Sequence, residues 1–356
     1  MENISLRIII TLALAAVSFI VAGALTPVLA NILYRYKLGK NIRTGNESPI
    51  FQQLHAKKAG TPTMGGILIW GTAILLAGLF WLLATLWPDN EILKLFNFVN
   101  RRETFLPLAA LLFAALVGLA DDLRGIFKQG EKGGGLSMRT RLLLYTAVAA
   151  VGAWWFVVKL DYTALYVPFL GLVDIGLWYI PFFLFIIVAS AFSTNETDGL
   201  DGLAGGVMLI AFSAFGAIAL SQGRFFLATF TAVIIGALLA FLWFNVHPAR
   251  FFMGDTGSMA LGITAGLVAL LTQSALFLPF IMFVPVVESL SVIIQLLSKR
   301  IRHKKVFLSA PIHHHFEALG WPETKVTMRF WILNGVAAAV GLALLFVSYQ
   351  VAPLPY

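Results

Sequence analysis

The sequence predicts an all-α polytopic membrane protein. Of its 356 residues, 59% are hydrophobic and only 12% are charged, whereas water-soluble domains carry about 25% charged residues. Ten apolar runs are long enough for a membrane helix, which needs about 20 residues. The chain has no cysteine, which excludes disulfides and thiolate chemistry. Orientation in a membrane explains the net charge of +8, so we predict no nucleic-acid partner.

The apolar runs predict the helices one by one. The first lacks a small-residue cleavage site after a short apolar core, so it indicates a membrane helix and not a removed signal peptide. Turn residues such as Pro88, Gly223 and Pro248 separate later runs. No repeat or inserted soluble segment is visible, so residues 1–356 are predicted to form a single integral membrane domain. The ten runs are 5–34, 64–87, 104–120, 140–159, 175–193, 201–221, 225–245, 257–273, 275–298 and 328–350.

The basic residues predict the orientation of these helices. Loops 35–63, 121–141, 194–200, 246–256 and 299–329 hold 6, 5, 0, 1 and 7 Lys and Arg residues, which is 19 of the 25 in the chain. Short loops rich in Lys and Arg stay in the cytoplasm. We therefore expect these five loops on the cytoplasmic face and both termini on the outer face.

Acidic residues are also concentrated on the predicted cytoplasmic side, and several lie at the end of a predicted helix. Asp121 and Asp122 end the third apolar run. Neighbours on a helix point about 100° apart, so the two need not share a ligand. If both face one cavity, their repulsion favours a proton on one of them, which suits a proton acceptor. The alternative is a pair of solvated acids at a helix end.

Two further acidic loops precede the sixth and eighth runs. The first contains Asn195, Asp198, Gly199, Leu200 and Asp201. A helical turn would place Asp198 and Asp201 on one face, and the glycines let a ligand approach the backbone. The second contains Phe252, which could stack on a base, and Asp255. The alternative for both loops is an acid that caps a helix.

Three consecutive histidines, His313, His314 and His315, precede the last apolar run. On a helix their side chains fan out and cannot all bind one ion, whereas in an extended segment His313 and His315 share a face. Zinc prefers His and Cys, and carboxylates favour magnesium or manganese. We therefore assign a metal to the aspartates and contacts with phosphate to the histidines. The alternative is a solvated loop.

Other polar residues lie beside these loops. Lys58 and Thr63 precede the second run, where the lysine could hold a nucleotide or a diphosphate, or simply anchor the helix end. Asn245 and Gln295 lie near helix ends, where they could also make interhelical hydrogen bonds. The basic run 299–305 suits contact with anionic membrane lipid.

These residues together resemble the phospho-N-acetylmuramoyl-pentapeptide transferase family, within the polyprenyl-phosphate N-acetylhexosamine-1-phosphate transferase superfamily. The resemblance runs nearly end to end. The aspartate motifs are typical of the superfamily, while the run 62–66 and the three histidines are typical of the muramoyl branch. The stretches that carry it are 60–66, 121–122, 197–204, 241–245, 252–258, 310–317 and 320–323.

The resemblance implies a fold and an activity. It implies ten helices in a bacterial inner membrane, with both termini periplasmic and the active site on the cytoplasmic face. It implies transfer of phospho-MurNAc-pentapeptide from UDP-MurNAc-pentapeptide to undecaprenyl phosphate, which forms lipid I and UMP in peptidoglycan biosynthesis and requires Mg²⁺. It also suggests a homodimer.

The resemblance also implies roles for single residues. Asp255 would be the metal ligand and Asp121 the base toward the lipid phosphate, with Asp122 in support. His313 and His314 would meet the diphosphate or its analogues, and we count all three histidines as catalytic. The implied substrate-binding residues are Lys58, Gly199, Leu200, Asp201 and Phe252 around uridine, Asn195, Asp198 and Thr63 beside it, and Asn245 and Gln295 nearby.

Residues 192–199 depart from the family pattern Asn-Ala-Val-Asn-Leu-Thr-Asp-Gly, and two of the changes bear on the site. Phe192 replaces the first Asn, and Glu196 replaces the Leu and adds a charge. Direct attack by the lipid phosphate and a two-step route through a phospho-aspartate both remain open, as does a sister transferase that uses another UDP-sugar. A transporter would line a path with ionisable residues at mid-membrane, but here they gather at one surface, with Glu288 the main exception.

Overall fold

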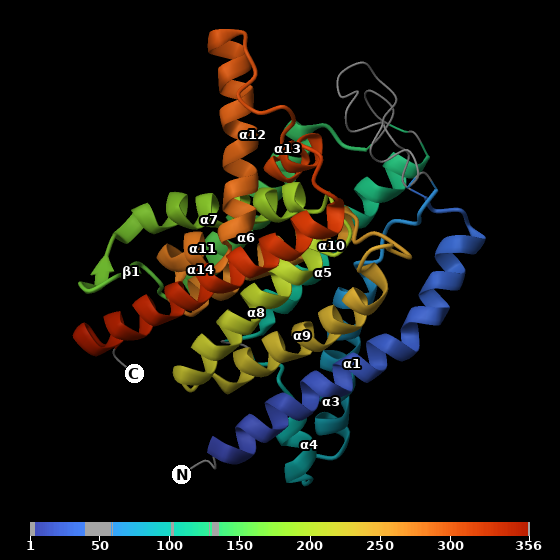
Figure 1. Ribbon diagram of the computed structural model, residues 1–356. Helices are drawn as coiled ribbons and strands as arrows, with labels where there is room; N and C mark the ends of the chain where they lie inside the picture. The colour runs from blue at the N-terminus through green and yellow to red at the C-terminus, as the bar shows by residue number, and fades with distance from the viewer. Residues whose placement is uncertain are drawn as a thin grey trace.

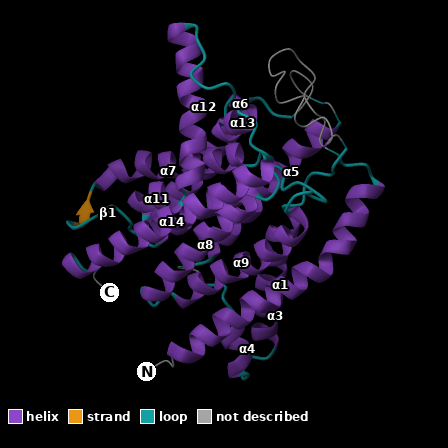
Figure 2. Cartoon of the chain, in the orientation of Figure 1, coloured by secondary structure: helices purple, strands orange, loops and turns teal. Residues whose placement is uncertain are grey.

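The computed structural model describes residues 4–39, 58, 60–100, 103–127, 129 and 135–354. Nearly all of its regular structure is helical, as predicted (Figures 1 and 2). The exception is a small antiparallel hairpin of β1 (Ala164–Val167) and β2 (Gly171–Asp174). The helices are α1 (Ile4–Arg35), α3 (Ile67–Leu86), α4 (Glu91–Phe96), α5 (Phe105–Ile126), α6 (Met138–Trp154), α7 (Tyr179–Thr197), α8 (Leu203–Ser221), α9 (Phe225–Asn245), α10 (Asp255–Leu271), α11 (Leu278–Ile281), α12 (Phe283–Arg302), α13 (Ile312–Ala318) and α14 (Glu323–Val351).

The chain is a multi-pass membrane protein. Among the described residues, eight helices are long and apolar enough to cross a membrane, or nine if α11 and α12 together form one span. Their bounds agree with the predicted runs to within a few residues. The eighth predicted run, 257–273, corresponds to α10, which has only 17 residues. The exact number of spans therefore stays a prediction.

Helix α10 lies at the centre of the bundle. Every residue of it from Thr256 to Leu271 is buried, and it packs most extensively against α5 and α7. A helix surrounded by protein does not need the length of one that faces lipid. Its first residue is Asp255, so the central helix delivers this acid to the end of the bundle.

The predicted continuous helix over 275–298 is wrong, because the chain bends by 88° between α11 and α12. Pro279 and Pro285 both lie in first turns, where a missing N–H is tolerated. The Asn334 side chain accepts a hydrogen bond from Val284 N at 3.0 Å and donates one to Ile281 O at 3.2 Å. It thereby satisfies backbone groups that a break inside a membrane would leave unpaired. Beyond the break, α12 projects away from the bundle (Figure 1).

Both termini lie at the end of the bundle that is remote from α13 (Figure 1). Near the C-terminus, the Tyr166 hydroxyl of the hairpin lies 2.8 Å from Ser348 Oγ and donates to Ala352 O. Near the N-terminus, the Arg7 guanidinium lies over the Phe226 ring at the start of α9. The opposite end collects the C-terminal ends of α5, α7 and α9 and the N-terminal ends of α8, α10 and α14. The compartment that each end faces stays a prediction.

Candidate active site

Asp122 caps the central helix from a neighbouring one. Its Oδ1 accepts a hydrogen bond from Asp255 N at 3.2 Å, and its Oδ2 accepts one from Thr256 N at 3.0 Å. The first N–H groups of a helix lack partners within it, and the helix dipole favours negative charge there. Asp122 on α5 is therefore the capping group of α10, and Thr63 Oγ1 donates a long hydrogen bond of 3.5 Å to the same carboxylate.

Asp121 and Asp255 share one guanidinium. Arg141 Nε lies 2.6 Å from Asp121 Oδ2, and Arg141 Nη2 lies 3.0 Å from Asp255 Oδ2. The second oxygen of Asp121 accepts from Leu136 N, and the second oxygen of Asp255 accepts from Asn195 Nδ2 at 2.7 Å. Asp121 is buried, whereas the Asp255 side chain is 20% exposed. Four predicted site residues, Asp121, Asp122, Asn195 and Asp255, thus lie together.

Glycines allow this close approach. Gly254 has φ of 75°, and a Cβ there would meet Asp122 Oδ2 and Thr63 Oγ1 at 2.6 Å. Its N–H donates to Asp198 Oδ2 at 3.1 Å, which ties the loop before α8 to the start of α10. Backbone hydrogen bonds of 2.8 Å from Gly65 N and Gly66 N to the carbonyl oxygens of residues 252 and 253 hold the other side of the same turn. The predicted acids therefore lie close together because the backbone before α10 packs closely against its neighbouring segments.

Comparison with known proteins shows the family of the chain. Residues 104–273 match the model of glycosyl transferase family 4, and residues 58–69 match signature 1 of phospho-N-acetylmuramoyl-pentapeptide-transferase. A protein of that name from Clostridium perfringens is 40% identical over 329 residues, which cover 92% of this chain and 96% of the relative. The chain belongs to the phospho-N-acetylmuramoyl-pentapeptide-transferase family.

Two further relatives of the same name agree. The Ruegeria pomeroyi protein is 41% identical over 339 residues, covering 89% of this chain and 88% of the relative. The Chloroflexus aggregans protein is 39% identical over 354 residues, covering 95% and 91%. The similarity of this chain to the transferase family thus extends over almost the whole length of both partners.

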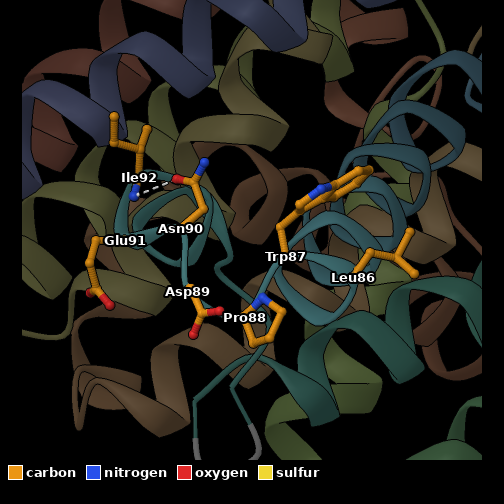
Figure 3. A pocket seen from close by; sticks show the side chains of 7 residues that line it. All are labelled: Leu86, Trp87, Pro88, Asp89, Asn90, Glu91 and Ile92. Carbon is orange, nitrogen blue, oxygen red and sulfur yellow. Dashed lines mark hydrogen bonds between the residues drawn. The ribbon is translucent and has the colours of Figure 1, made fainter.

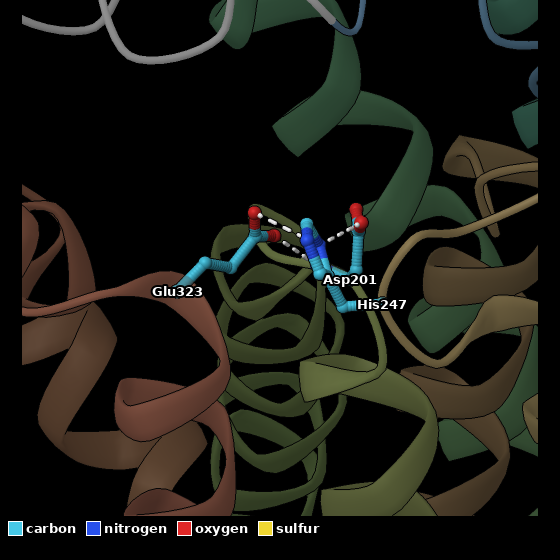
Figure 4. A group of neighbouring side chains, drawn as sticks. All are labelled: Asp201, His247 and Glu323. Carbon is cyan, nitrogen blue, oxygen red and sulfur yellow. Dashed lines mark hydrogen bonds and ion pairs between the residues drawn. The ribbon is translucent and has the colours of Figure 1, made fainter.

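A second polar group surrounds Lys58. Its ammonium lies 2.7 Å from Asp201 Oδ1 and 2.5 Å from Glu323 Oε1, and 5.8 Å from the centre of the Phe252 ring. His247 Nδ1 lies 2.9 Å from Asp201 Oδ2 and 3.5 Å from Glu323 Oε2, so side chains from three segments meet in this group (Figure 4). Burial of the Asp201 carboxyl group opposes its ionisation, but the hydrogen bond and charge of Lys58 outweigh burial and lower its pKa.

The structure contains a possible acidic metal-binding group, but not at Asp255. The ligand atoms of Asp201, His247 and Glu323 all lie within 4.8 Å of one another. The Lys58 ammonium contacts both carboxylates of this group, so it supplies the positive charge that an ion would bring. The Asp255 side chain, in contrast, is 20% exposed, and its carboxylate is the kind of oxygen ligand that magnesium prefers. Its role as the metal ligand stays a prediction.

Asp198 and Asp201 do not share a face, contrary to the expectation of a helical turn. Residues 198–202 form turns, which direct Asp198 toward Gly254 and Asp201 toward Lys58. Each acid therefore serves a different polar group. The Leu200 side chain between them is buried in an apolar cluster with Val326 and Phe330, and contact of this residue with a ligand stays a prediction.

The three histidines lie on a helix, so the extended arrangement of the segment is ruled out. Along α13 each side chain has its own partner: His313 Nδ1 lies 3.0 Å from Glu288 Oε2, His314 Nδ1 lies 2.7 Å from Glu317 Oε2, and His315 Nδ1 accepts from Leu308 N. Burial opposes protonation of His313, but the Glu288 carboxylate outweighs it and raises the pKa of His313. Glu288 is therefore a buried partner of this histidine.

His313 also contacts the turn at Gly199. A Cβ at Gly199 would come within 2.7 Å of His313 Cε1, so only glycine permits this approach. His313 Nε2 is buried and makes no hydrogen bond with the described residues. This loop and α13, which the sequence places far apart, therefore meet at the His313 ring.

Two predicted substrate-binding residues brace loops in the structure. Gln295 donates from Nε2 to Phe307 O and accepts from Val306 N and Phe307 N, which holds the segment before α13. Asn245 accepts from Gly202 N and donates to Phe251 O, which joins the two acidic loops. Both side chains use their polar groups within the protein, and direct contact with substrate stays a prediction.

Three residues of these groups are absent from the predicted site: Arg141, His247 and Glu323. The predicted loop 121–141 contains Arg141 among five basic residues that are each typical of the positive-inside pattern, whereas this arginine lies in the first turn of α6. A hollow of about 630 Å³ lies elsewhere, at the turn between α3 and α4, lined by residues 86–92 (Figure 3). It contacts none of the residues of the two polar groups.

Proposed function

We propose that the protein transfers phospho-MurNAc-pentapeptide from UDP-MurNAc-pentapeptide to undecaprenyl phosphate, with release of UMP and formation of lipid I. The observation that carries this proposal is the convergence of Asp121, Asp122, Asp198 and Asp255 from three separate segments at one end of the bundle. The relatives named as this transferase, similar over nearly the whole chain, support the choice of substrates.

The Lys58 group is the proposed site for the uridine of the donor. Phe252 offers a ring for base stacking, and Lys58 and Asp201 offer a cation and an ionised acceptor beside it. Glu323 accepts hydrogen bonds from both Lys58 Nζ and Asp201 N. It therefore fixes the distance between these two groups, which a planar base with donors and acceptors at fixed positions requires.

The diphosphate would then lie between the uridine site and the acids. Asp255 would hold Mg²⁺, which when bound neutralises charge on the diphosphate and on the departing UMP. Phosphoryl transfer asks mainly for positioning and electrostatic stabilisation. A phosphate monoester is mostly ionised near neutral pH because its second pKa is about 6. The lipid phosphate therefore needs little help from a base.

Direct attack by the lipid phosphate is the proposed route. Both oxygens of Asp121 are engaged, one by Leu136 N and the other by Arg141. Such a carboxylate is better suited to orienting its neighbours than to carrying a phosphoryl group. Inversion of configuration at phosphorus would support a single step, and a trapped phospho-aspartate would contradict it.

An apolar cavity suits the tail of the lipid acceptor. It has a volume of about 300 Å³ and lies between α5, α6, α7 and α10. Each of these helices also carries one residue of the connected group at the end of the bundle: Asp121 on α5, Arg141 on α6, Asn195 on α7 and Asp255 on α10. At 1.5 Å per residue, Ile263 and Ile187 lie about 12 Å along their helices from Asp255 and Asn195. Phe113 and Val151, which line the cavity, are exposed on the surface that lipid would cover.

The test is an assay of UMP release. Purified protein should release UMP from UDP-MurNAc-pentapeptide only when undecaprenyl phosphate and Mg²⁺ are both present. Chelation of the metal should stop the reaction, and its return should restore it. Faster release with another UDP-sugar would instead favour a sister transferase, and no release with any donor would contradict the proposal.

We further propose that the acid end of the bundle faces the cytoplasm, because 19 of the 25 basic residues lie in the loops on that side. The chain has no cysteine, so single cysteines introduced at Arg302 and Asp89 would report each face by labelling of intact cells. Labelling of the position at Arg302 from outside would contradict this orientation. The homodimer stays a prediction, which the mass of the protein in detergent would test.

A further inference from the structure

Arg141 connects two of the acids that the proposed function requires. Its Nε and Nη2 contact Asp121 and Asp255 at 2.6 and 3.0 Å. Its Nη1 donates to Asn195 Oδ1 at 3.2 Å, and Asn195 Nδ2 donates to Asp255 Oδ1 at 2.7 Å. Arg141, Asn195 and Asp255 thus form a closed ring of three interactions, with Asp121 attached to it.

The negative charges of Asp121 and Asp255 explain why a positively charged side chain lies between them. Asp121 is buried and Asp255 is mostly buried, and like charges at short range repel strongly where water is scarce. The Arg141 side chain is only 14% exposed, so its charge is weakly screened. A guanidinium presents several donors in a fixed fork and can join two carboxylates, which a single ammonium does less well.

We propose that Arg141 is a positioning residue that holds Asp121 and Asp255 in place of a divalent cation, and thereby sets how tightly the site binds that cation. This inference rests on the proposed function for its metal site at Asp255. The ion and the guanidinium compete for the same oxygen of Asp255. Arg141 therefore weakens metal binding by the free protein, and keeps the acids arranged until the ion and substrate arrive.

The test measures metal affinity directly. Mn²⁺ is titrated into the full-length protein in detergent, without donor or acceptor, and free Mn²⁺ is followed by electron paramagnetic resonance. Arg141→Gln should bind Mn²⁺ about tenfold more tightly than wild type, since one partly screened positive charge beside the ion is removed. Arg139→Gln, on the same turn of α6 but exposed, should leave the affinity unchanged. Asp255→Asn should abolish binding.

An unchanged or weaker affinity in Arg141→Gln would overturn the inference, as would the absence of Mn²⁺ binding in both proteins. If Arg141→Gln does not fold, the measurement uses Arg141→Lys instead. Lysine keeps the positive charge but lacks the several fixed donors with which the guanidinium joins two carboxylates. Its affinity should rise severalfold, and an affinity equal to wild type would overturn the inference. The measurement uses no substrate, so its outcome is independent of whether wild type releases UMP.

Discussion

Gly118→Ala tests whether close contact between α5 and α10 positions the acids. A Cβ at Gly118 would lie 2.6 Å from Thr256 Cα, and nearer still to the Asp255 carbonyl group. Ordinary van der Waals contact begins at 3.4 Å, so the two helices must separate by at least about 0.8 Å. Both partners are backbone, so no side chain can rotate away. Overpacking of this kind costs about 1–3 kcal/mol.

The effect on turnover should exceed the effect on folding. Gly118 lies one helical turn before Asp121 and Asp122, and the clash falls on the first turn of α10. A misplacement near 1 Å lowers the rate of a positioned reaction by about 10²-fold. We therefore expect UMP release to fall by about two orders of magnitude in a protein that still folds, with a modest decrease in its melting temperature in detergent.

Gly78→Ala is the matched control. Gly78 also lies in a membrane helix, but a Cβ there would meet nothing within 4 Å. Both substitutions change backbone freedom in the same way, so the difference between them isolates the clash. If Gly118→Ala releases UMP as fast as Gly78→Ala, the contact between the two helices does not position the acids, and the reasoning is wrong.

Three further substitutions test single roles. Asp255→Asn should abolish UMP release while the melting temperature stays near that of wild type, and retained turnover would remove Asp255 from the metal site. Phe252→Ala should weaken UMP binding in calorimetry by about 1–3 kcal/mol if its ring stacks on uracil, and an unchanged Kd would exclude stacking. Glu196→Leu should lower the pKa of His313, because the carboxylate helps to raise it. If the reaction needs protonated His313, the alkaline limb of the pH–rate profile then moves to lower pH, and a stationary limb would contradict this role.

The membrane helices could be predicted because their signal is local. An apolar run must form a helix in lipid to satisfy its backbone, so composition alone located α1, α9 and α14 to within a few residues. The bend between α11 and α12 was missed because half of its cause is remote. Pro279 and Pro285 were visible in the sequence, but Asn334, which satisfies the broken backbone, comes from α14.

The acids of the site could be predicted, but their partners could not. An acid at the end of an apolar run is unusual enough to attract attention, as at Asp121 and Asp255. Arg141 was hidden because a basic residue in a cytoplasmic loop is expected for topology alone. Glu323 was hidden because an acid at the start of a helix is a common cap. In both cases the function depends on a contact between distant segments, which one sequence does not record.

The structure gives a physical role to Glu196, which departs from the family pattern. Glu196, where the family usually has Leu, acts with Glu288 and Glu317 to favour the protonated form of His313. Hydrogen bonds from a charged donor to phosphate are about twice as strong as neutral ones. His313 Nε2 is buried against Gly199 and makes no hydrogen bond with the described residues. The extra carboxylate at residue 196 thus helps to raise the pKa of a ring that lies against Gly199, and it replaces none of the residues assigned to chemistry.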